Sequence, residues 1–221
     1  PLAWRRVPPA GRGWPRWTKF AGEVLLDVRF CVLGLEVEGS WLEARVLELW
    51  AELASRGLKL KPHVWLSTEW FSPDGIPGIA LPFYLAHPRL ARLERKMMLE
   101  VEGGSREECM AILRHESGHC AQHAWRLHRR EQWRKLFGDT QRPYPQVYRP
   151  NPASQRFVQH LRQYYAQAHP DEDFAETFAV WITPRSAWKR RYAGWPAIKK
   201  LEYVDALLRE LRGVAPSVKT R

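Results

Sequence analysis

One predicted helix constrains the fold of this chain more than any other feature. A capping box of Ser105 and Glu108 starts this helix, and its helical pattern continues to about Arg130. In its middle, residues 115–119 read H-E-x-x-H. The rest of the chain must therefore fold around a helix that carries two imidazoles and a carboxylate close together.

The two histidines of this motif can bind one metal ion. His115 and His119 lie four residues apart, which places their Cβ atoms about 5 to 6 Å apart on one helix face. Glu116 is offset by about 100° around the axis, so its carboxylate can reach a metal-bound water without ligating the ion. We therefore expect His115 and His119 to bind one Zn²⁺ per chain and Glu116 to be the catalytic base.

The third ligand is expected from another segment. His123 lies one helical turn beyond the motif but is poorly placed to complete a tetrahedron. The acidic stretch 171–176 is the best source, because Glu172 and Glu176 are one turn apart on a predicted helix. One carboxylate can bind the metal while the other accepts a hydrogen bond from a ligating imidazole. Asp171 can at the same time be the N-cap of that helix, with its acidic neighbours favoured by the helix dipole.

The remaining pattern predicts one α+β domain over 20–212, between a basic arm rich in tryptophan and proline over 1–19 and a basic tail over 213–221. Trp4, Trp14 and Trp17 would pin the arm. Most of the other tryptophans are expected in the core or at its rim. We expect a helix over 40–56, strands over 63–71, 79–85 and 97–101, an irregular proline-rich crossing over 139–154, and helices over 154–167, 172–182 and 196–212.

One of these strands is a candidate for binding an extended substrate. Pro82 lies within 79–85 and favours a position at the edge of the sheet, because proline cannot donate a backbone hydrogen bond. An open edge can pair with an added strand. We therefore expect the substrate to bind along 79–85.

The metal motif and the acidic stretch together resemble the gluzincins. In that group the third zinc ligand is a glutamate on a later helix. In two of its members, anthrax lethal factor and the Mlc titration factor peptidases, this glutamate is followed by an aromatic pair and alanine. The resemblance implies that Glu172 is the ligand and that Glu176 orients a ligating imidazole. Asp173 stands where the gluzincins have an aromatic residue, so another division of roles among residues 172, 173 and 176 stays open.

The same resemblance points to a tyrosine. Both named gluzincins place a tyrosine seven residues before the ligand glutamate, and Tyr165 occupies that position here. Its hydroxyl would stabilise the oxyanion of the tetrahedral intermediate. Tyr164 and Tyr165 can also belong to an aromatic stripe with Phe157, and His169 is the other possible donor.

Over about 20–212 the chain is most similar to a bacterial family named "putative zinc-binding metallopeptidase". This resemblance implies a zincin-like fold in which a small N-terminal sheet lies over the active-site helix and the C-terminal half is helical. It also implies hydrolysis of a peptide or protein substrate by a zinc-bound water that Glu116 activates. It implies no particular substrate.

Charge and composition keep other functions open. The net charge of +11 is concentrated in 1–19, 126–149 and 185–221. These basic segments can bind an acidic partner or a polyanion, or they can be solvated faces. A catalytically silent zinc or scaffold protein and a zinc hydrolase of a non-peptide amide are therefore the alternatives to a peptidase.

We expect a cytoplasmic protein with no membrane span. No stretch approaches the roughly 18 apolar residues that cross a bilayer. The three cysteines are an odd number, and Cys109 and Cys120 lie too far apart along one predicted helix to form a disulfide. The oligomeric state cannot be predicted from these features.

Overall fold

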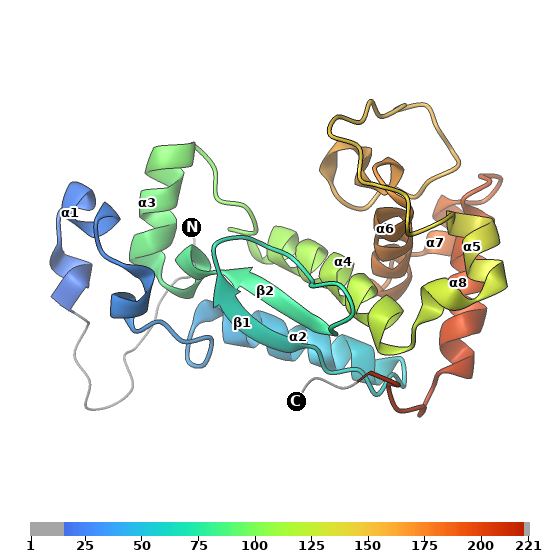
Figure 1. Cartoon of the computed structure of the whole chain (residues 1–221), viewed down its shortest axis with the longest axis horizontal. Helices are drawn as coiled ribbons and strands as arrows, with labels where there is room; N and C mark the ends of the chain where they lie inside the picture. Colours follow the sequence, from blue (N-terminus) through green and yellow to red (C-terminus); the bar gives the residue numbers. More distant parts are fainter. Residues whose placement is uncertain (1–15, 219–221) are drawn as a thin grey trace.

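The computed structural model describes residues 16–218, which form an elongated body with helices at both ends and a small sheet near the middle (Figure 1). The strands are β1 (His63–Ser67) and β2 (Gly78–Pro82). The α-helices are α1 (Gly22–Leu26), α2 (Trp41–Ser55), α3 (Pro88–Met98), α4 (Arg106–Ala124), α5 (Glu131–Phe137), α6 (Pro170–Ile182), α7 (Trp188–Arg191) and α8 (Ile198–Glu210). The 3₁₀ helices are η1 (Arg16–Lys19), η2 (Phe30–Leu33), η3 (Phe83–Ala86), η4 (Leu127–Arg129) and η5 (Arg162–Gln167).

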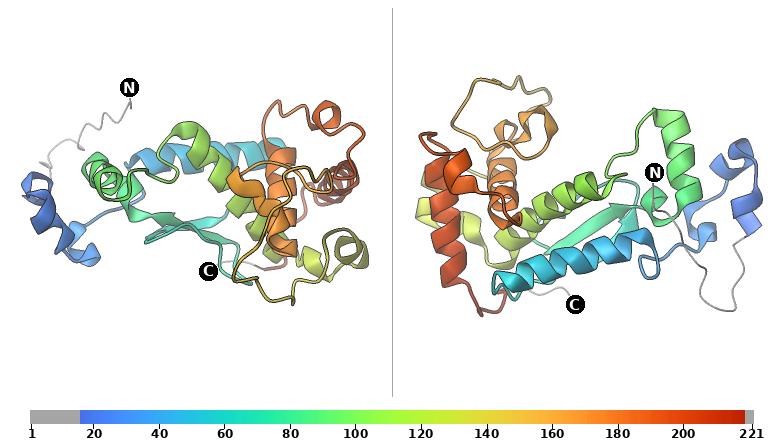
Figure 2. Two further views of the ribbon diagram at one scale, coloured as in Figure 1. Left: turned by 90° about the horizontal axis from the view of Figure 1, so that it is seen from above. Right: turned by 180° about the vertical axis from the view of Figure 1, so that it is seen from behind.

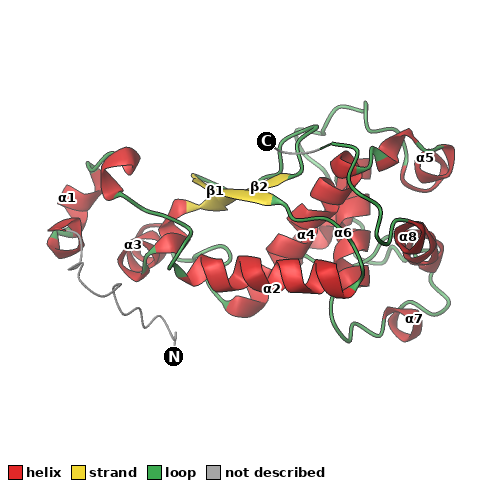
Figure 3. Ribbon diagram, turned by 90° about the horizontal axis from the view of Figure 1, so that it is seen from below, coloured by secondary structure: helices red, strands yellow, loops and turns green. Residues whose placement is uncertain are grey.

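The expected α+β composition is confirmed. β1 and β2 pair in parallel, with Val64 opposite Ile79, and the sheet lies on one side of α2 and α4 (Figure 3). β2 is buried along its whole length and packs against α4.

A serine side chain caps the start of α2 and of α4. The hydroxyl of Ser40 accepts a hydrogen bond from the N–H of Leu42 over 3.2 Å, and Glu43 accepts one from the N–H of Gly39 over 2.7 Å. Ser105 caps α4 by accepting a hydrogen bond from the N–H of Glu108 over 3.1 Å. Local sequence therefore decides where α2 and α4 begin.

The predicted strand over 97–101 is wrong. Residues 88–98 form α3, which begins with Pro88 in its first turn, and Nδ1 of His87 accepts a hydrogen bond from the N–H of Arg89. A strand in a sheet would require these apolar residues to be at least half-buried. At the end of α3 they are exposed. A short apolar run cannot by itself distinguish a helix end from a strand.

The strand that we expected to be an open edge is covered. Ala80 of β2 faces Trp65 of β1 on one side, and its N–H donates to the carbonyl of Phe71 over 2.8 Å on the other. Pro82 ends the strand and leads into η3, so it marks a terminus instead of an edge. The prediction that an extended substrate pairs with residues 79–85 is therefore wrong.

Two predicted helices differ from the structure. α4 ends at Ala124, because Arg126 adopts a left-handed backbone with φ 53° before η4 begins. The expected helix over 154–167 is irregular as far as η5, inside which Gln163 and Tyr164 have φ values of 62° and 56°. The predictions for α6 and α8 are confirmed to within a few residues.

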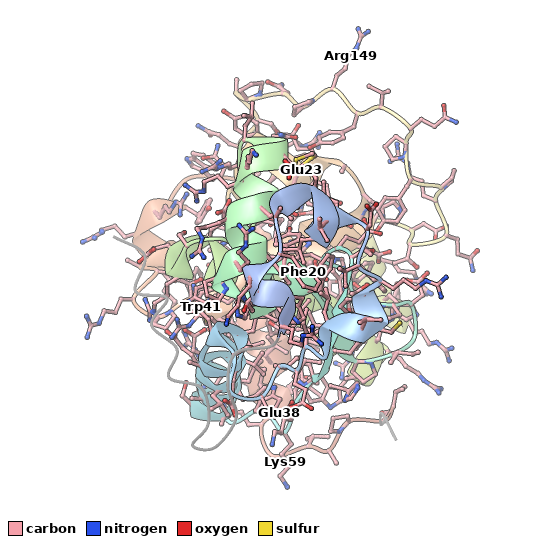
Figure 4. All side chains as sticks on the ribbon, turned by 90° about the vertical axis from the view of Figure 1, so that its left-hand side faces the viewer. Phe20, Glu23, Glu38, Trp41, Lys59 and Arg149 are labelled. Atoms are coloured by element: carbon pink, nitrogen blue, oxygen red, sulfur yellow. The ribbon has the colours of Figure 1, made fainter. Side chains whose placement is uncertain are left out.

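The centre of the C-terminal half is the contact between α4 and α6. Gly118 allows their close approach, because a Cβ atom at this position would lie 2.7 Å from Cα of Ala175. From Glu172 to Ile182, α6 is buried throughout. A long loop over 138–161 arches above α6 (Figures 1 and 2), and Arg149 points outward from its tip (Figure 4).

The chain ends are described in part. Trp4 and Trp14 of the predicted arm lie outside the described residues, whereas Trp17 is buried and its Nε1 donates to the carbonyl of Leu33 over 2.9 Å. At the other end, the N–H groups of Ser217 and Val218 both donate to the carbonyl of Ala124. The three cysteines are free. Across residues 16–218, none of the helices has the length and apolar character needed to span a bilayer.

Candidate metal centre

Three side-chain atoms from α4 and α6 converge at one point. Nε2 of His115 lies 3.2 Å from Nε2 of His119. Oε2 of Glu172 lies 3.0 Å from the first of these nitrogens and 3.3 Å from the second. The close contact of α4 with α6 at Gly118 holds this triangle together. Two imidazoles and one carboxylate form a set that could hold a metal ion.

The size of the triangle fits zinc. Zinc binds nitrogen and oxygen ligands at about 2.0–2.1 Å, for which the edge of a tetrahedron is about 3.3–3.4 Å. The three separations of 3.0 to 3.3 Å come close to this edge. Oε2 of Glu172 is also buried and accepts no hydrogen bond of suitable geometry within residues 16–218. A cation would satisfy this oxygen, and three protein ligands would leave a fourth position for water or substrate.

The second carboxylate oxygen of Glu172 has a different partner. The hydroxyl of Tyr144 donates to Oε1 over 2.8 Å. The Tyr144 ring stacks on His169, with the ring centroids 3.9 Å apart, and Nε2 of His169 donates to the carbonyl of Arg142 over 2.6 Å. The long loop is thus attached to the first turn of α6, and only one oxygen of Glu172 faces the imidazoles.

Glu176 lies on the opposite side of His115. Its Oε1 is 2.9 Å from Nδ1 of that histidine, and its Oε2 accepts hydrogen bonds from the N–H groups of His160 and Leu161. Glu176 is fully buried. This arrangement directs Nε2 of His115 towards the triangle, because the proton on Nδ1 is held by the carboxylate.

Asp173 is directed away from the triangle. Its Oδ2 pairs with Nζ of Lys200 at 2.5 Å, and this lysine also lies over the ring of Phe157. Residues 172 and 176 share one face of α6, whereas residue 173 is rotated by about 100°. Of the three acidic residues considered from sequence, the structure therefore brings Glu172 and Glu176 to the histidines.

The protonation of the metal-free centre follows from its contacts. Burial opposes the charged form of His115, but its close contacts with the carboxylates of Glu172 and Glu176 raise its pKa to about 10. Burial alone would raise the pKa of Glu172, but the close contacts of its carboxylate with the imidazoles of His115 and His119 outweigh burial and lower it. Without a metal, the centre thus pairs a protonated imidazole with a carboxylate.

Glu116 lies beside the triangle without belonging to it. Burial raises the pKa of its carboxyl group, while the neighbouring His115 and His119 lower it. Its Oε2 is buried and has no hydrogen-bond partner in the described part of the chain. A carboxylate with a raised pKa and a free oxygen next to a metal-binding set has the properties of a general base.

Tyr165 lies near the histidines, whereas His169 is occupied. The ring centroid of Tyr165 is 5.6 Å from that of His115. Because residues 154–161 are not helical, a helical aromatic stripe with Phe157 does not account for this position. Burial raises the pKa of the Tyr165 hydroxyl, which therefore stays protonated as a donor. His169 uses Nε2 for the carbonyl of Arg142 and Nδ1 as an acceptor for the N–H of Asp171.

His123 does not join the metal-binding set. Its Nε2 lies 3.7 Å from a carboxylate oxygen of Asp74, and within residues 16–218 the convergent group contains only His115, His119 and Glu172. One further turn of α4 carries His123 past the triangle.

Sequence reasoning missed two contributors to the centre. Tyr144 stands between two prolines in the long loop, and the only available signal was that such a segment is ordered but irregular. The backbone N–H groups of His160 and Leu161 were missed because this stretch was predicted to be helical. In a helix, those groups would bond to carbonyls one turn earlier rather than to Glu176.

Comparisons with known proteins agree with a metal centre at this place. A model of the family described as "Putative zinc-binding metallo-peptidase" matches residues 95–193. The matched segment contains α4, the long loop and α6, and hence His115, His119 and Glu172. No curated protein and no solved structure matched the chain. The chain is thus similar to a family of zinc-binding metallopeptidases over the segment that builds its candidate metal centre.

Proposed function

We propose that this chain is a gluzincin-type zinc metallopeptidase with a zincin-like fold. The observation that carries the proposal is the triangle of ligand atoms from His115, His119 and Glu172, with the buried carboxylate of Glu116 next to it. The family match over residues 95–193 supports the same reaction class. One Zn²⁺ per chain would be held by these three side chains.

Each neighbouring residue has a role in this proposal. Zinc, when bound, supplies a Lewis acid that polarises the scissile carbonyl and lowers the pKa of water. Glu116 accepts the proton of the attacking water and then passes it to the amine that leaves. Tyr165 donates a hydrogen bond to the oxygen on which negative charge develops. Glu176 holds His115 in the orientation that ligation requires.

Hydrolysis of an unstructured protein tests the proposal. Zinc-loaded wild type should cleave a casein substrate, and Glu116→Gln should reduce the rate by about 100-fold or more while keeping the same zinc content. The matched control is Glu107→Gln, which makes the same change at an exposed position of the same helix. Cleavage that persists in Glu116→Gln would contradict the role of this base.

The same assay separates the alternative functions. A catalytically silent zinc or scaffold protein would bind zinc but cleave neither casein nor other amides. A hydrolase of non-peptide amides would leave casein intact and cleave cell-wall fragments or amide-linked tags in a Glu116-dependent way. Binding of polyanions through the basic segments, if it occurs, should weaken steeply with salt and persist in Glu116→Gln.

A further inference from the structure

A polar cavity lies near the metal centre, between the end of α4, residues 74–75 and the first turn of α6. Its volume is about 420 Å³. His123, one helical turn beyond His119, and Asp171, which directly precedes Glu172, both line it. The cavity therefore adjoins the ligand-bearing segments of both helices.

The wall of the cavity contains a buried acceptor without a donor. Gln122 is only 1% exposed, and its Nε2 donates to Oδ1 of Asp171 over 2.6 Å. Its Oε1 has no hydrogen-bond partner in the described chain, and neither does the buried Nδ1 of His128. Buried polar atoms are almost always hydrogen-bonded in folded proteins. The free Oε1 therefore indicates a ligand that supplies an N–H group.

The cavity also contains two arginines without partners. Within residues 16–218, the side chains of Arg126 and Arg129 form no ion pair or hydrogen bond, whereas the next residue, Arg130, pairs with Glu210 at 3.2 Å. Arg126 has a left-handed backbone with φ 53°, at a helix end where glycine is favoured. Both arginines are exposed, so their guanidinium groups can meet a ligand in the cavity that they line.

Among the titratable side chains that line the cavity, the guanidinium groups of Arg126 and Arg129 are the charges available to a ligand. The carboxylate of Asp171 is occupied by Gln122, and the side chain of Asp74 is fully exposed to solvent. Burial lowers the pKa values of His123 and His128, so both are neutral near pH 7. Guanidinium groups bind carboxylates through paired, charge-assisted hydrogen bonds.

We propose that this cavity is a substrate subsite for a carboxylate of the peptide. Arg126 and Arg129 bind the carboxylate, and Oε1 of Gln122 accepts a hydrogen bond from a main-chain N–H of the substrate. The inference rests on the proposed peptidase function. The carboxylate can belong to an acidic side chain or to the C-terminus of the substrate, because both present the same group.

Binding of three matched peptides tests the subsite without turnover. One peptide has a central glutamate and an amidated C-terminus, the second has glutamine and an amidated C-terminus, and the third has glutamine and a free C-terminus. Their affinities for zinc-loaded Glu116→Gln are measured by calorimetry, and the NMR signals of the His123 and His128 rings report where they bind. We expect a peptide with the matching carboxylate to bind about tenfold more tightly than the amidated glutamine peptide.

Arginine variants test whether the cavity causes this preference. In the Glu116→Gln background, Arg126→Ala with Arg129→Ala should remove the difference between the peptides, whereas Arg130→Ala should retain it. Preference for glutamate identifies the acidic side chain, and preference for the free C-terminus identifies the terminal carboxylate. If the double variant does not fold, Arg129→Gln alone provides the comparison.

The outcomes separate the subsite from the peptidase function. Equal affinities for all three peptides, no binding of any of them, or a preference that survives the double substitution would overturn the subsite. Carboxylate-dependent binding that shifts the His123 and His128 signals supports it even if wild type cleaves nothing, and in that case the proposed peptidase function fails. If wild type cleaves casein but the peptides show no carboxylate preference, the peptidase function stands and the subsite fails.

Discussion

Oε1 of Glu176 lies 2.9 Å from Nδ1 of His115, on the side of the ring that faces away from Glu172. The contact joins two residues that are 61 positions apart in the chain. Side chains of α6 therefore contact both nitrogens of the His115 ring, since Glu172 contacts Nε2 and Glu176 contacts Nδ1. Substitution of Glu172 or Glu176 should therefore alter metal binding at His115.

Glu176→Gln tests this orientation directly. The amide would present an N–H group either to His115 or to the backbone N–H groups of His160 and Leu161, so one of its hydrogen bonds is lost. We expect zinc affinity, measured by competition with a chelator, to fall by about 10- to 100-fold. Glu107→Gln, at an exposed position of α4, is the control, and an unchanged affinity in Glu176→Gln would show that the contact is not needed.

Tyr144→Phe should change the coordination of the metal. The hydroxyl of Tyr144 occupies Oε1 of Glu172, so that only Oε2 is free to bind an ion. Without the hydroxyl, both oxygens can coordinate, and the visible absorption of the Co²⁺-substituted protein should weaken as a five-coordinate ion replaces a tetrahedral one. Tyr148→Phe is the control, because the Tyr148 hydroxyl donates to the carbonyl of Gln163 instead. Identical Co²⁺ spectra for wild type and Tyr144→Phe would refute this role.

Zinc binding should release protons and depend on pH. The pKa of His115 in the metal-free protein is raised from 6.5 to about 10, so the ring carries a proton at neutral pH that zinc must displace. Zinc affinity should therefore increase as the pH rises towards 10. Calorimetry in buffers of different ionisation enthalpy should detect the released proton. Affinity that is independent of pH would contradict the pairing of His115 with the two carboxylates.

The stability of the metal-free protein should change over the same range. A raised histidine pKa stabilises the folded state below its ordinary value of 6.5, and this contribution is lost as the pH rises towards 10. The melting temperature of the chelated protein should therefore fall in this window. The melting temperature of the zinc-loaded protein should fall less over this range, because its His115 ring is already neutral. Parallel losses in the two forms would argue against this assignment.

Gly118→Ala should separate α4 from α6. The added Cβ would lie 2.7 Å from Cα of Ala175, a backbone atom that cannot yield without moving the helix. We expect a loss of about 1–3 kcal/mol in the free energy of unfolding, together with weaker zinc binding. Gly22→Ala in α1 is the matched control, since its Cβ would make an ordinary contact of 3.5 Å with Leu93. Equal stabilities of the two variants would show that the helices can adjust.

Local signals were sufficient to predict the parts of the centre that lie on helices. The caps of α2 and α4 depend on residues within one turn, and the spacing of His115 with His119 and of Glu172 with Glu176 follows from the helical repeat. Spacing could therefore name the two histidines and the pair of glutamates, while the resemblance to the gluzincins selected Glu172 as the ligand.

The features that sequence reasoning missed depend on distant contacts. Tyr144 reaches Glu172 only because the loop is attached to α6 through His169, and no local pattern encodes that path. The open edge expected at Pro82 was wrong because Phe71 pairs with Ala80 of β2. Both features depend on contacts between separate segments, which periodicity cannot identify.

The most direct test of the central claim is an anomalous difference map at the zinc absorption edge, from crystals of the zinc-loaded protein. We predict one strong peak per chain that touches Nε2 of His115, Nε2 of His119 and Oε2 of Glu172. A peak at another set of residues, or no peak in crystals of protein with bound zinc, would contradict the proposed coordination and the hydrolase that depends on it.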